Sequence, residues 1–144
     1  METIIYPAKE EDYDKVRNFA NQAGRNLAFT ETAQYLLMTD KSDKLLATLG
    51  VYIEGNHALI RSLVMDSAAC KIPDLFHFLD TAAGYAEGKG AKAVFFATLI
   101  PGELFAPLGF EVIAFTDLPG DAQQVFFDQY SRYPQTLIIL KKTC

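Results

Sequence analysis

The chain has 144 residues, half of them hydrophobic, which suits one folded domain over residues 1–144 and excludes an intrinsically disordered protein. Its 13 basic and 18 acidic residues give a net charge of −5 without a block of like charge, so the footprint of a nucleic-acid-binding protein is absent. The two cysteines, Cys70 and Cys144, have no metal-ligand spacing, and no metal site is expected. The N-terminal residues resemble neither a signal peptide nor a membrane span, so we expect a cytoplasmic protein that does not enter membranes.

A short strand and a helix open the predicted secondary structure. Residues 4–6 favour a strand, and residues 9–23 favour a helix with acidic residues in its first turn and Gly24 as its stop. Residues 25–33 are predicted to form a loop with a short helical turn. An antiparallel meander follows, because polar turns separate three β-favouring segments. These segments are residues 34–39, 44–53 and 57–65.

The strand at residues 57–65 runs directly into a helix. This strand is nearly all apolar, which predicts a central position buried on both faces. Pro73 suits a first helical position, and apolar residues recur at three- and four-residue spacing from there to residue 87. Such a junction commonly binds phosphates, because the first-turn N–H groups of the helix are unpaired. The strand predicted over residues 91–98 would then follow by a right-handed crossover.

The C-terminal third is predicted to contain two short helical segments and two strands. The predicted segments are a helix at 103–109, a strand at 110–115, a helical segment at 122–130 and a strand at 136–141.

This order of elements resembles the GNAT (general N-acetyltransferase) superfamily over nearly the whole chain. Residues 50–65 are similar to a strand–turn–strand of the arsenic-resistance-type N-acetyltransferases, residues 104–111 to the family's Phe-Tyr-x-x-x-Gly-Phe-Glu, and residues 133–141 to its closing strand. The resemblance implies an α/β (α+β) fold with a mixed, mostly antiparallel sheet of six to seven strands, helices on both faces and a V-shaped splay after the fourth strand. It also implies transfer of an acetyl group from acetyl-CoA to the amine of a small molecule.

The resemblance further implies where acyl-CoA binds. In that family the pantetheine arm pairs with the splayed fourth strand, and the pyrophosphate sits on a loop with the pattern Arg/Gln-x-x-Gly-x-Gly/Ala. The implied cofactor-binding residues are Leu63, Val64, Met65, Lys71, Asp74, Thr98 and Phe105. Phe105 stands where the family usually has a tyrosine that protonates the departing thiolate.

The pyrophosphate loop departs from the family pattern. Cys70 replaces the arginine or glutamine, and Pro73 and Leu75 replace the two glycines. Proline lacks an N–H donor, and the Asp74 carboxylate competes with an incoming anion for the helix N-terminus. Lys71 is the one compensating charge. Either CoA binds weakly and differently here, or the loop no longer binds it.

Four residues are candidates for the acceptor side. Arg61 lies in an apolar strand, where it either binds the carboxylate of an amino-acid-like acceptor or forms a salt bridge with Glu54 or Glu31. Glu54 and His57 flank the preceding turn, and each is either the general base that deprotonates the amine or a surface residue. Tyr130, with neighbouring aromatic residues, forms a wall of the acceptor pocket, a dimer contact or part of the core.

Two functions are open at this point. The first is an N-acyltransferase for a small-molecule amine, which bears a carboxylate if Arg61 is its anchor. The second is a GNAT-fold protein that no longer catalyses and serves as a binding or dimerisation module. A homodimer is compatible with both.

Overall fold

The computed structural model of the chain describes residues 3–24 and 33–144. It contains one seven-stranded sheet, whose strands are β1 (Ile4–Pro7), β2 (Ala33–Thr39), β3 (Leu45–Glu54), β4 (His57–Met65), β5 (Ala93–Thr98), β6 (Phe110–Ile113) and β7 (Ile138–Thr143). Their order across the sheet is β1-β2-β3-β4-β5-β7-β6. Only β4 and β5 pair in parallel; the other neighbours are antiparallel. This confirms the predicted mixed, mostly antiparallel sheet.

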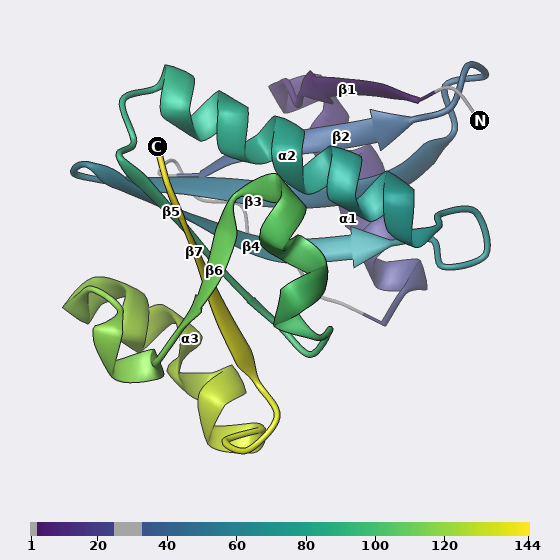
Figure 1. Cartoon of the computed structure of the whole chain (residues 1–144). Helices are drawn as coiled ribbons and strands as arrows, with labels where there is room; N and C mark the ends of the chain where they lie inside the picture. Colours follow the sequence, from purple (N-terminus) through teal and green to yellow (C-terminus); the bar gives the residue numbers. More distant parts are fainter. Residues whose placement is uncertain (1–2, 25–32) are drawn as a thin grey trace.

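The helical elements cover both faces of the sheet, as expected (Figure 1). They are α1 (Tyr13–Gln22), α2 (Ile72–Gly88) and α3 (Gly120–Arg132), with 3-10 turns η1 (Glu10–Asp12), η2 (Gly102–Leu108) and η3 (Phe115–Asp117). Side chains alternate between the faces: Leu36 packs with α2, whereas Leu37 packs with α1. In β4, Leu59 packs on the α3 side. None of the helices in the described ranges is long and apolar enough to cross a membrane.

Several element ends differ from the sequence prediction. The predicted strand at 110–115 stops at Ile113, because the η3 turn starts at Phe115. The closing strand begins at Ile138 and not at residue 136, because the Leu137 N–H donates back to the Tyr133 carbonyl in a turn. The predicted helix at 103–109 is a 3-10 turn. The loop predicted at 25–33 lies outside the described residues except for its last position.

Strand β4 has a bulge in its pairing with β3, near the centre of the sheet. Gly50 of β3 pairs with Arg61 and Thr48 pairs with Val64, so β4 has one residue more than β3 between these pairs. Ser62 takes a φ of 59°, a conformation that is uncommon for residues other than glycine. Bulges bend a strand and re-aim its side chains. The parallel ladder between β4 and β5 ends at Ile60, although β4 continues to Met65.

Candidate functional site

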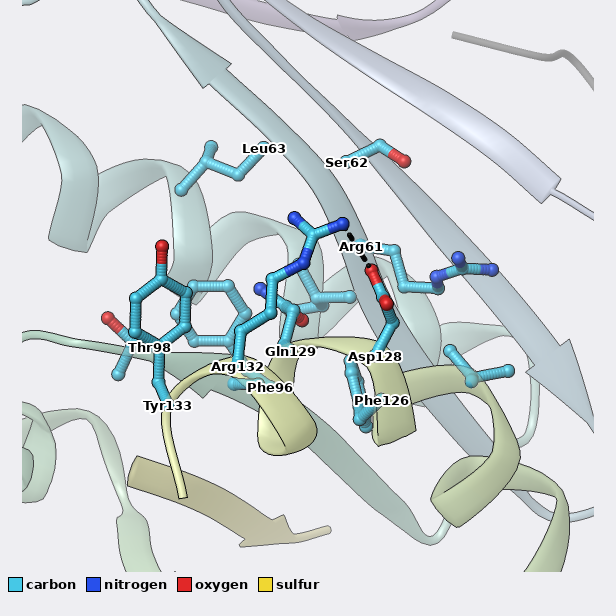
Figure 2. Close-up of a pocket in the computed structure, with 13 residues that line it drawn as sticks. Arg61, Ser62, Leu63, Phe96, Thr98, Phe126, Asp128, Gln129, Arg132 and Tyr133 are labelled. Atoms are coloured by element: carbon cyan, nitrogen blue, oxygen red, sulfur yellow. Dashed lines mark ion pairs between the residues drawn. The ribbon is translucent and has the colours of Figure 1, made fainter. Parts of the chain in front are cut away.

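A cavity of about 580 Å³ lies where β4 and β5 diverge (Figure 2). This volume is within the usual range for sites that bind small molecules. Three elements line it: β4, β5 and α3 with the residue that follows it. The lining residues are Ile60, Arg61, Ser62, Leu63, Phe96, Ala97, Thr98, Val125, Phe126, Asp128, Gln129, Arg132 and Tyr133. The cavity therefore presents both apolar surface and charged side chains.

Arg61 is the cation that the strands contribute to this cavity. Its guanidinium carbon lies 4.9 Å from the centre of the Tyr52 ring, a cation–π contact. Over residues 3–24 and 33–144 Arg61 forms no ion pair, so the predicted salt bridge with Glu54 is absent. Glu31, the other predicted partner, lies outside the described residues. No carboxylate among the described residues therefore competes with a ligand for this guanidinium.

Gly50 and Tyr35 determine where the Tyr52 ring lies against Arg61. Tyr35, Gly50 and Arg61 are direct neighbours across β2, β3 and β4. A side chain at Gly50 would place its Cβ 2.9 Å from Tyr52 Cε1, so the ring can lie there only because this residue is glycine. The Tyr35 and Tyr52 hydroxyl groups are hydrogen-bonded at 3.2 Å. Burial, and then this hydrogen bond, raise the pKa of Tyr35, which keeps its hydroxyl protonated.

The opposite wall carries charged and polar side chains from α3. Arg132 Nη2 lies 2.9 Å from Asp128 Oδ2, and Figure 2 shows this pair beside the strand segment of Arg61 and Ser62. Gln129 lies between them in sequence. Val125, Asp128, Gln129 and Arg132 are spaced by three, four and seven residues, which places them on one face of a helix. The sequence prediction missed this wall, although that spacing was a usable signal.

Glu54 and His57 lie at the other end of β4. His57 Nε2 donates to Asp121 Oδ2 at 2.9 Å, and this hydrogen bond lowers the pKa of Asp121. Neither Glu54 nor His57 lines the cavity. Four residues of extended strand separate His57 from Arg61, which is about 13 Å. The predicted role of either residue as general base therefore stays a prediction, and the structure does not bring them to the cavity.

The aromatic residues near the C-terminus divide into two groups. Tyr130 stacks on Phe115, with ring centres 4.1 Å apart, and does not line the cavity. Phe126 and Tyr133 do line it. Tyr133, and not Tyr130, is therefore the tyrosine that a bound ligand would contact.

The predicted cofactor residues are also divided. Leu63 and Thr98 line the cavity, where the two strands separate. Val64 is buried, and Met65 lines a second hollow of about 500 Å³ beside α1. Phe105 is fully buried, at 0% exposure. Leu63 and Thr98 thus lie at the cavity, whereas Phe105 does not line it.

Phe105 is a core residue in this chain. Its ring packs edge-on against Phe76 and Phe96, with ring centres 5.2 and 6.3 Å away. Phe96 contacts Phe105 and also lines the cavity, so its ring lies between Phe105 and the cavity. A proton donor at this position would have to reach past that ring.

The α2 junction has few unpaired backbone N–H donors. The Lys71 N–H donates to the Asp74 carboxylate at 2.8 Å, and Pro73 has no N–H. The Cys70 thiol is buried and donates to the Leu46 carbonyl at 3.4 Å, and burial raises its pKa. Cys70 therefore has the character of a structural thiol and not of a nucleophile. The described residues also contain no group of His, Cys, Asp and Glu side chains placed to hold a metal ion.

The chain resembles solved structures by fold and not by sequence. No protein-family model and no curated protein matches it. N-acetylglutamate synthase from Neisseria gonorrhoeae, solved with coenzyme A and N-acetyl-glutamate, superposes with a TM-score of 0.71 at 17% identity over 99% of this chain and 35% of the synthase. This chain thus spans about a third of that protein.

Two further solved structures match over nearly the whole length of both chains. Rv2747 from Mycobacterium tuberculosis, solved with CoA, gives a TM-score of 0.72 at 13% identity over 98% of this chain and 99% of its own. A GNAT-family acetyltransferase from Staphylococcus aureus Mu50 gives 0.67 at 12% identity over 99% of each chain. With the bulged β4, the β4–β5 divergence and the sheet order, these matches show that the chain has the GNAT acetyltransferase fold.

Proposed function

We propose that this chain is an N-acyltransferase that moves an acetyl group from acetyl-CoA to the amine of a small, carboxylate-bearing molecule. The observation that carries the proposal is the cavity at the end of the β4–β5 ladder, with Arg61 on its wall and without an ion pair among the described residues. The fold supports it, because the N-acetylglutamate synthase with the same fold was solved with coenzyme A and an acetylated amino acid.

Arg61 is proposed to bind the acceptor's carboxylate. A guanidinium presents two parallel N–H donors that match a carboxylate, and such charge-assisted pairs are stronger than neutral hydrogen bonds. The stacking of Arg61 on Tyr52 fixes its plane before the ligand arrives, which reduces the entropy lost on binding. Asp128 on the facing wall would attract the acceptor's ammonium group.

Glu54 or His57 is proposed as the general base. Glu54 or His57 was predicted for this role, and both lie at the far end of β4 from the cavity. Either residue would need a relay of waters along the α3 side to accept the amine proton. Acetyl-CoA would supply the activated acetyl group as a thioester.

A second function is favoured by one observation. The backbone N–H groups at the start of α2 donate to carboxylate and carbonyl groups of the chain itself, which leaves a poor site for the diphosphate of CoA. A GNAT-fold module that binds a small carboxylate without catalysis, or that dimerises, would have this property.

Product analysis separates the two functions. The protein would be incubated with acetyl-CoA and a panel of amino acids, and acetylated products would be detected by mass spectrometry. We expect an acetylated, carboxylate-bearing amine that disappears in Val125→Trp, which fills the cavity, and persists in Arg17→Gln, an exposed α1 variant far from it. Failure to acetylate any amine, with the fold intact, would favour the binding module.

A further inference from the structure

The turn between β4 and α2 satisfies its own backbone donors. The Ala68 N–H donates to Asp66 Oδ1 at 3.0 Å. The Ala69 and Cys70 N–H groups donate to the Asp66 carbonyl at 3.0 and 2.9 Å. Three consecutive amides therefore point at Asp66, and an anion arriving at this turn would have to break those hydrogen bonds.

The first turn of α2 is occupied in the same way. The Lys71 N–H donates to Asp74 Oδ2, and the Asp74 and Leu75 N–H groups donate to the Lys71 carbonyl at 3.0 and 3.1 Å. Pro73 has no N–H to offer. Of the described segment from residue 70 to residue 75, this leaves the Ile72 N–H alone for an incoming anion. One backbone N–H gives a diphosphate too few hydrogen-bond donors.

The charged side chains around this junction do not favour an anion either. Two carboxylates, Asp66 and Asp74, lie at the turn and at the helix start. Lys44, in the turn before β3, is ion-paired with Asp66 at 3.9 Å. Within residues 33–144 Lys71 is the remaining cation of the junction, and it is exposed, so solvent ions screen it. The two carboxylates therefore balance the two lysines, and a diphosphate would meet no net positive charge.

The neighbouring cavity, where β4 and β5 diverge, presents apolar side chains beside its polar ones. The β4–β5 ladder ends at Ile60, and the cavity that opens there is lined by Leu63 and Thr98. We propose that the chain binds its acyl donor through the pantetheine arm alone, so that the nucleotide diphosphate of CoA adds little to the affinity. The donor class is then acyl-pantetheine thioesters in general, with acetyl-CoA as one member. This proposal rests on the proposed function.

Comparing three probes tests it. The wild-type protein would be titrated calorimetrically with acetyl-CoA, S-acetyl-pantetheine and adenosine 3′-phosphate 5′-diphosphate, the nucleotide half of CoA. We expect the two thioesters to bind with Kd values within about threefold of each other, and the nucleotide not to compete. A Kd for acetyl-CoA that is roughly tenfold or more below that of S-acetyl-pantetheine would overturn the proposal. Failure of both thioesters to bind would instead refute the proposed function itself.

A pair of variants identifies the cause. Asp74→Ala frees the Lys71 N–H and removes one negative charge, so it should tighten acetyl-CoA binding by about threefold or more while S-acetyl-pantetheine binding stays unchanged. Asp117→Ala is the matched control, because Asp117 accepts the Ala114 N–H in the same way at η3, away from the junction. Equal affinities for acetyl-CoA in Asp74→Ala and in the wild type would show that the carboxylate does not exclude the nucleotide.

Discussion

Replacing Arg61 by glutamine separates a ligand-binding role from a structural one. The structure gives Arg61 one cation–π contact, with Tyr52 at 4.9 Å, and no ion pair within the described ranges. Such a contact at a half-buried site contributes about 1 kcal/mol, whereas breaking a buried salt bridge costs about 3–5 kcal/mol. Arg61→Gln should therefore lower the free energy of unfolding by about 1 kcal/mol, which for a chain of this size lowers Tm by about 2–4 °C.

Acceptor binding should respond much more strongly. Loss of a hydrogen-bonded charge pair costs about 1.5–3 kcal/mol, which corresponds to a roughly 10- to 150-fold increase in the Kd or KM of a carboxylate-bearing amine. Urea unfolding measures the first effect, and acetyl transfer to L-glutamate at varied concentration measures the second. Arg132→Gln is the control for stability, because its exposed pair with Asp128 should contribute less than about 0.5 kcal/mol. A stability loss above about 3 kcal/mol with unchanged acceptor KM would refute the anchoring role of Arg61.

Three further substitutions test the packing and electrostatics around the site. Gly102→Ala would overlap the Val112 side chain, so we expect a loss of about 1–3 kcal/mol in urea unfolding; an unchanged midpoint would mean that the backbone there yields easily. Asp121→Ala removes the partner of His57 and should cost less than about 1 kcal/mol at pH 7, because the pair is partly exposed. This hydrogen bond lowers the pKa of Asp121, so the stability that it contributes is present above the ordinary pKa of aspartate and is lost as the pH falls through the lowered pKa. The unfolding free energies of the variant and the wild type should therefore converge in acid. A difference that stays constant with pH would contradict this. Phe105→Tyr places a hydroxyl in the core and should cost about 1–3 kcal/mol without raising turnover, whereas faster turnover would show that the position reaches the reaction centre.

Much of the sheet and of α2 could be predicted from local patterns. The helix followed from apolar residues at three- and four-residue spacing, and the meander from polar turns between β-favouring segments. The bounds were less accurate where a turn competes with a strand. The closing strand begins at Ile138 because a hydrogen bond from Leu137 to Tyr133 holds the preceding residues in a turn.

The site was predicted only in part, because it depends on strand register and on where α3 packs. Arg61 was identified from its place in an apolar strand and Leu63 from the resemblance to the GNAT superfamily, and both line the cavity. The contact of Arg61 with Tyr52 depends on the register of β3 against β4, in which Gly50 pairs with Arg61 and Tyr52 with Leu59, and the local sequence does not reveal this register. Aromatic residues of this segment were predicted as a pocket wall, but the polar and charged residues of α3 were missed, because a helical face shows which residues lie together and not which strand they approach.

The distance of the acid–base candidates from the cavity also could not be predicted from the sequence. Glu54 and His57 are close to Arg61 in sequence, but an extended strand places them at the opposite end of β4. The partner of His57, Asp121, is 64 residues away in sequence, and no local pattern predicts such a pair.

Thermal unfolding with increasing acetyl thioester measures whether the β4–β5 cavity binds an acyl donor. A ligand that binds only the folded state at ten times its Kd stabilises it by about 1.4 kcal/mol, which should raise Tm by about 3–6 °C. We expect a saturable shift with both acetyl-CoA and S-acetyl-pantetheine, and a much weaker one in Val125→Trp, whose larger side chain obstructs the cavity. No shift of the wild-type Tm at millimolar concentrations of either thioester would contradict the assignment of this chain as an acyltransferase.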